Sequence, residues 1–161
     1  MARRLFTTFV LLATTALLAG SPALADDAKP VAKEKSKTRI LFLTQSKGFR
    51  HGSVNRRKEL APAEIAMKQL GQQTGLFTCD CSQDSKADFT KENLAKYDIV
   101  MFYTTGVLDI DDATRDYFVN DWLKQEGHGW IGFHSAADTY RTKDEKHAWY
   151  WELCGGTFTG H

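Results

Sequence analysis

The chain has 161 residues, which is enough for one domain with a hydrophobic core. Lysine and arginine together number 21 and aspartate and glutamate 20, so the formal net charge is +1. This balance excludes the strongly basic character of a nucleic-acid-binding protein, or of a protein held electrostatically at an anionic membrane.

Residues 1–25 have the pattern of a secretory signal peptide. Arg3 and Arg4 form a positively charged start, an apolar stretch follows, and Ala23-Leu24-Ala25 has the small-x-small form of a cleavage site. The apolar stretch is too short for a membrane anchor. We therefore expect export to the periplasm or the medium, cleavage before Asp26, and no membrane span in the mature protein.

The folded part is expected to begin after a linker. Residues 26–37 are polar and charged, which predicts a disordered linker before one domain over residues 38–161. Residues 38–44 contain a continuous apolar run, as in a strand covered on both faces. Residues 56–70 show apolar positions at helical spacing, with Gly71 as the expected end of that helix. The apolar face of this helix comprises Ala63, Ala66, Met67 and Leu70.

Strands and helices alternate along the rest of the chain. In order, we predict a strand over 76–81, a short helix over 90–94, a strand over 97–103, a helix from Asp109 or Asp111 to Gly127, and a strand from Gly129. This alternation predicts an α/β fold with a parallel sheet and helices on both faces. Four strands would leave one sheet edge exposed, so we expect the domain to be truncated at its C-terminus.

Three histidines follow predicted elements at which a ligand site is expected. His51 comes after the first strand, His134 ends the fourth, and His161 ends the chain. Ligands of open α/β sheets bind beyond the carboxyl ends of the strands. If the strand order is 2-1-3-4, the first and fourth strands flank the third, and their loops can meet there. We therefore predict His134 and His51 as catalytic acid/base residues.

A metal site is the second interpretation of the same histidines. With His161, the imidazoles of His51 and His134 could bind a divalent metal such as zinc. The sequence has no His-x-x-x-His or Cys-x-x-Cys spacing, which makes this the weaker interpretation. For each histidine, a structural or solvated role is the alternative.

Polar residues near the same strand ends are candidate substrate ligands. Lys47 and Arg50 could anchor a carboxylate, a phosphate or sugar hydroxyls, and a solvated basic loop is the alternative. Four further residues are expected to contact substrate at the same strand ends: Thr105, Gly106, Ser135 and Tyr140.

The three cysteines do not form an obvious disulfide framework. Cys79 and Cys81 lie two residues apart on a predicted strand, so a disulfide between them would be strained. A bond between Cys81 and Cys154 is possible, and buried free thiols are the interpretation that we favour.

Four segments carry a resemblance to a known family. They are Lys47–His51, Thr104–Gly106, Gly129–Ser135 and Leu153–His161. Together they make the chain, from residue 39 onward, resemble the trehalose-utilisation ThuA-like domain family, which has the flavodoxin-like fold of class I glutamine amidotransferases. The resemblance implies a role in the metabolism of trehalose-type or keto sugars. It also places His134 where amidotransferases carry a cysteine, so amidotransferase activity is not expected.

Two hypotheses of function are consistent with these residues and with the resemblance. The first is an exported domain that processes a small carbohydrate through histidines gathered in one cleft. The second is a non-catalytic domain of a larger parent protein that binds a carbohydrate or another protein. The second predicts scattered histidines and an open aromatic surface around Trp149 and Trp151.

Overall fold

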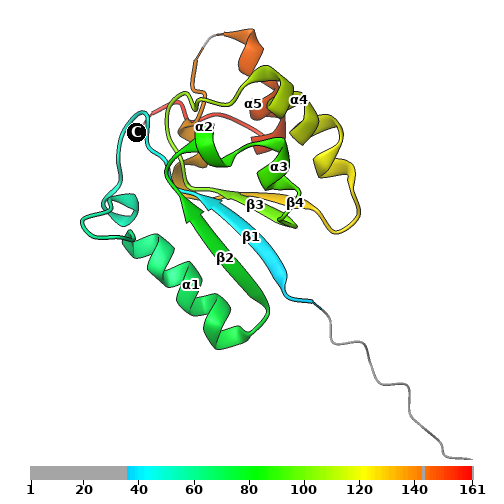
Figure 1. Cartoon of the computed structure of the whole chain (residues 1–161). Helices are drawn as coiled ribbons and strands as arrows, with labels where there is room; N and C mark the ends of the chain where they lie inside the picture. Colours follow the sequence, from blue (N-terminus) through cyan, green and yellow to red (C-terminus); the bar gives the residue numbers. More distant parts are fainter. Residues whose placement is uncertain (1–35, 143, 161) are drawn as a thin grey trace, which may run out of the picture. The chain divides into compact units, whose positions relative to one another are not determined.

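The computed structural model describes residues 36–142 and 144–160, and Figure 1 shows its elements. The predicted signal peptide, nearly all of the predicted linker and His161 lie outside the described residues. In the described part of the chain, no helix has the length and apolar character needed to cross a membrane.

Four parallel strands form one sheet in the order β2-β1-β3-β4, which confirms the predicted α/β class. The strand β1 lies between β2 and β3, so that Ile40 of β1 is paired with Cys79 on one side and with Ile99 on the other. The strands are β1 (Thr38–Leu43), β2 (Phe77–Ser82), β3 (Ile99–Phe102) and β4 (Gly129–Gly132).

Helices cover both faces of this sheet (Figure 1). One face packs against α1 (Pro62–Thr74). The other face packs against α3 (Lys91–Leu94), α4 (Asp112–Asn120) and α5 (Ala148–Cys154), and α2 (Ser85–Asp88) precedes Phe89, which is buried in the same core. Short 3₁₀ turns complete the described chain: η1 (Gly52–Val54), η2 (Trp122–Lys124), η3 (His134–Asp138) and η4 (Glu145–His147).

Alternate side chains of the central strands enter two different cores. On β1, Ile40 and Phe42 pack under α1, while Leu41 and Leu43 pack under the helices of the opposite face. Burial on both faces explains why the strand sequences are continuous apolar runs. At the sheet edge, α1 no longer covers β4, and Ile131 remains 42% exposed.

The helix α1 differs from the prediction at both ends. It begins at Pro62, because the fixed φ of proline and its missing N–H suit the first helical turn. It continues through Gly71 and ends at Gly75, whose φ of 68° is left-handed. A Cβ atom on Gly71 would lie 2.7 Å from the carbonyl oxygen of Phe77, so this glycine permits close packing of α1 on β2.

The inward face of α1 is also rotated from the predicted one. Ala66 and Leu70 are exposed, whereas Glu64 and Gly71 are buried. A buried glutamate was not expected, because carboxylates are rarely buried without a partner.

The three cysteines are free thiols. The sulfur atoms of Cys79 and Cys81 lie 3.8 Å apart under α1, and Cys154 lies at the end of α5. The free thiols agree with the favoured interpretation, but only Cys79 is buried, whereas Cys81 and Cys154 are half-buried.

Candidate functional site

The loops after β1 and β3 are joined at the carboxyl edge of the sheet. The backbone N–H of Lys47 donates to the carbonyl of Thr105 at 2.9 Å. The Thr105 hydroxyl accepts from the N–H of Gly48 at 3.3 Å and donates to the carbonyl of Phe49 at 2.8 Å. Thr105 is 1% exposed, so its contacts fix the loop that carries His51.

Gly106 brings the same two loops into backbone contact. Its φ is 74°, a region that favours glycine. A Cβ atom there would lie 2.6 Å from the amide nitrogen of Gly48. Gly106 also accepts a hydrogen bond from the N–H of Tyr140 at 2.9 Å, which links the turn after β4 to the same edge.

His134 occupies a strained turn directly after β4. Its φ is 50°, a left-handed conformation that is uncommon for residues other than glycine. The turn is held by the hydroxyl of Ser135, which donates to the carbonyl of Thr104 at 3.2 Å, and by a 2.6 Å contact between the hydroxyls of Thr104 and Thr139. Such conformations cluster at functional sites, where the surrounding structure maintains them.

The turn after β4 places His134 against His51. The ring centroids lie 4.6 Å apart with an interplanar angle of 64°. Tyr103 lies against both rings, with centroid distances of 6.0 Å to His51 and 5.4 Å to His134. Its hydroxyl lies 2.7 Å from the hydroxyl of Ser53, which ties η1 to the end of β3.

The two imidazoles line a cleft of about 420 Å³. Aromatic side chains of Phe49 and Phe158 form apolar walls, and Ser135 and Asp138 supply polar groups. Within residues 36–142 and 144–160, no group hydrogen-bonds to either imidazole, so the ring nitrogens are available to a ligand. A mixed apolar and polar lining of this size is typical of small-molecule sites.

The surroundings of His51 favour its neutral form. Burial is the largest influence that lowers the pKa of His51, and the nearby charge of His134 lowers it further. The carboxylate of Asp138 opposes these effects without reversing them. Near pH 7, His51 is therefore neutral and can accept a proton.

A family model described as ThuA, trehalose utilisation, matches residues 39–161. The chain belongs to this family. No curated protein and no solved structure matches the chain. The matched residues include the loops that carry His51 and His134.

A buried ion pair anchors the His51 loop of this ThuA domain. The Nε and Nη2 groups of Arg56 donate hydrogen bonds to the carboxylate of Glu64 at distances of 2.8 to 3.1 Å. The side chain of Glu64 is fully buried. Arg56 also donates to the carbonyl of Cys81 at 3.1 Å. The ion pair therefore connects the loop to both α1 and β2.

The environment of Glu64 keeps its carboxylate charged. Burial would raise its pKa, but hydrogen bonds from Arg56, the Thr44 hydroxyl and the backbone N–H of Ala61 outweigh burial and lower it. Sequence reasoning missed this network. The available signal was a glutamate on the same helical face as Met67 and Gly71.

The other predicted ligands occupy different places. Ser135 lines the cleft, whereas Arg50 is exposed beside it. Lys47 forms an ion pair of 2.7 Å with Asp109. Tyr140 is 3% exposed and its hydroxyl donates to the carbonyl of Leu108 at 3.3 Å, so its described contacts belong to the core.

The described part of this ThuA domain contains two of the three predicted metal ligands, His51 and His134. No group of three His, Cys, Asp or Glu side chains there could hold a metal ion. His161, the third predicted ligand, lies outside the described residues.

Proposed function

We propose that this ThuA domain is an exported protein that binds a small carbohydrate, of trehalose or keto-sugar type, in the imidazole cleft. The observation that carries the proposal is the pairing of His51 with His134, 4.6 Å apart, in a cleft with aromatic walls. The C–H faces of a sugar ring pack well on aromatic rings, and its hydroxyls need polar partners. Phe49, Phe158 and Ser135 offer both kinds of contact.

The paired imidazoles support proton transfer to or from the bound sugar. A base works best when its pKa lies near or below the working pH, so that its neutral form is present. The lowered pKa of His51 meets this condition. His134, whose ring lies against that of His51, would then act on the same sugar as the partner acid. The reaction class that fits is proton abstraction beside a carbonyl, which an oxidised sugar would supply.

The test compares turnover of a disaccharide panel, in native and keto forms, by variants of the cleft. We expect His51→Ala and His134→Asn each to reduce turnover by at least 100-fold, the usual contribution of a general acid or base. Asparagine tolerates the left-handed backbone at position 134. The matched control is His128→Ala, since His128 precedes β4 and packs against Trp122, away from the cleft.

Unchanged turnover in both cleft variants would refute the proton-transfer role. Sugar binding that needs Phe49 but neither imidazole, with no turnover by the native protein, would support the binding-only hypothesis. The tryptophans of that hypothesis have other contacts: Trp149 packs on Tyr140 and Tyr150, and the indole N–H of Trp151 donates to the carbonyl of Tyr140 at 2.9 Å.

A further inference from the structure

The loop between β1 and α1 concentrates positive charge in a chain that is otherwise balanced. Residues 45–61 contain five cationic side chains and one acidic one, whereas the whole chain has 21 of the first and 20 of the second. The acidic residue is Glu59, and the cationic residues are Lys47, Arg50, Arg56, Arg57 and Lys58.

In the described part of the chain, two of these cations pair with acids from elsewhere in the fold. Lys47 pairs with Asp109, and Arg56 pairs with Glu64. Among residues 36–142 and 144–160, the other three form no ion pair. These unpaired cations are Arg50, Arg57 and Lys58.

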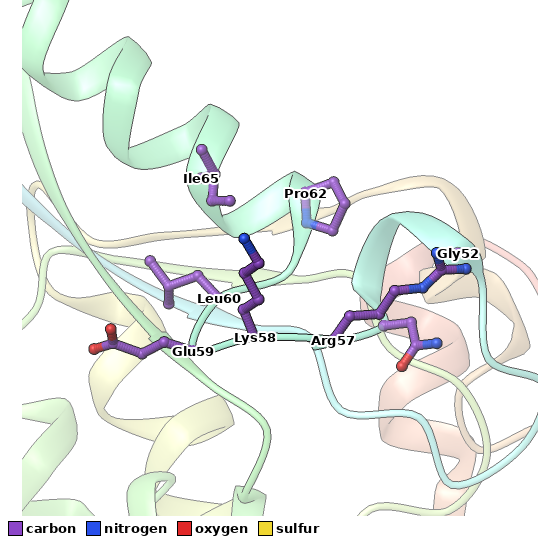
Figure 2. A pocket seen from close by; sticks show the side chains of 8 residues that line it. Gly52, Arg57, Lys58, Glu59, Leu60, Pro62 and Ile65 are labelled. Carbon is purple, nitrogen blue, oxygen red and sulfur yellow. The ribbon is translucent and has the colours of Figure 1, made fainter.

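Two of the unpaired cations line a second depression, of about 610 Å³, between the loop and the start of α1. Figure 2 shows the end of Lys58 reaching toward Ile65 of α1 and the end of Arg57 reaching away from it toward Gly52, while the carboxylate of Glu59 lies apart from both. Pro62 and Ile65 supply apolar surface beside them, and Ile65 is 42% exposed. The depression therefore combines positive charge with a surface suited to C–H groups.

The second depression and the imidazole cleft are lined by consecutive residues of the chain. Gly52, the first residue of η1, lines the depression, and its neighbour His51 lines the cleft. Arg50 is exposed next to the same turn. A ligand longer than one sugar ring could contact both hollows across this turn.

We propose that the second depression is an anion subsite, which binds the carboxylate or phosphate of an acidic saccharide whose sugar ring occupies the imidazole cleft. This inference rests on the proposed function and adds a substrate class to it. The guanidinium of Arg57 can bind two oxygens of a carboxylate or phosphate at once, and Lys58 adds a point charge. Pro62 and Ile65 would contact the carbon skeleton between the two groups.

The experiment measures binding to the full chain by calorimetry and by NMR of the imidazole signals. The probes are trehalose, trehalose 6-phosphate, a disaccharide with one glucuronate unit and inorganic phosphate, each at low and high salt. We expect the acidic disaccharides to bind about tenfold more tightly than trehalose, from two charge pairs at a partly exposed site. The advantage should shrink at high salt, because exposed charges are screened.

Matched variants test whether the tighter binding of acidic sugars depends on Arg57 and Lys58. Arg57→Gln combined with Lys58→Gln should abolish it, while Lys86→Gln combined with Lys124→Gln, which removes the same charge elsewhere, should preserve it. The stronger of the two acidic probes identifies carboxylate or phosphate as the preferred group.

The failures of the two proposals are distinguishable. Imidazole signals that no sugar moves would overturn the proposed function. Equal affinities for neutral and acidic disaccharides, or an advantage that survives the Arg57/Lys58 change, would overturn the anion subsite. Inorganic phosphate that binds as tightly as trehalose 6-phosphate would also overturn it, because the sugar would then contribute nothing.

Discussion

Glu64→Gln should destabilise the fold by about 3 kcal/mol at pH 7. Removing one member of a buried ion pair leaves the other charge uncompensated, which costs about 3–5 kcal/mol. We expect the lower end, because the side chain of Arg56 is 30% exposed while that of Glu64 is fully buried. Glutamine would also present an N–H₂ group to Arg56, which can only donate.

Urea unfolding followed by circular dichroism measures this effect. With an m-value of about 2 kcal/mol/M, the unfolding midpoint should fall by about 1.5 M. The matched control is Glu92→Gln on α3, where the carboxylate is exposed and a change within about 0.5 kcal/mol is expected. A double-mutant cycle with Arg56→Met should give a coupling free energy of about 0.5–3 kcal/mol, the range for residues in direct contact.

The pH dependence provides an independent check. The native pKa of Glu64 is lowered, so the stabilisation from its charge is fully present above the ordinary glutamate pKa of about 4.3. It is lost as pH falls through the lowered native value, where a protonated Glu64 resembles glutamine. A difference between native protein and Glu64→Gln that stays below about 1 kcal/mol, or that does not shrink in acid, would refute this reasoning.

Three other predictions concern the packing and titration of named groups. Gly71→Ala should destabilise the protein by about 1–3 kcal/mol in urea, because the added methyl meets the β2 backbone at 2.7 Å, and a gain in stability would contradict this. His134→Asn should raise the pKa of His51 toward its ordinary value in an NMR titration, because one of the two influences that lower it is removed. Iodoacetamide should modify Cys81 before Cys79 in a peptide map, since their hydrogen bond lowers the pKa of the Cys81 thiol and raises that of Cys79. Equal rates for the two thiols would argue against that hydrogen bond.

The sheet could be predicted because its signal is local. The continuous apolar runs of β1 and β3 reflect burial on both faces, which any fully covered strand requires. The meeting of His51 and His134 followed from the strand order, since loops after the first and fourth strands flank the third. The meeting of the two histidines could therefore be predicted from geometry that is common to all parallel sheets.

The remaining features depend on contacts between distant residues. The burial of Glu64 depends on Arg56 reaching both it and the carbonyl of Cys81, 25 residues away from the arginine. In the sequence, Gly71 has the pattern of a helix end. The close approach of Phe77 to α1 explains why a glycine stands at this position inside the helix. Phe158 lines the cleft from the far end of the chain, which no local pattern indicates.

The left-handed backbone at His134 affects how amino-acid replacements there should be interpreted. Most side chains lose about 1–2 kcal/mol in that conformation, before any question of chemistry arises. A variant at this position can therefore lose function for two reasons: the new residue disfavours the backbone conformation, or the imidazole is missing. Glycine and asparagine variants test the loss of the imidazole alone, because both residues tolerate this conformation. A valine variant that fails mainly reports the cost of the backbone conformation.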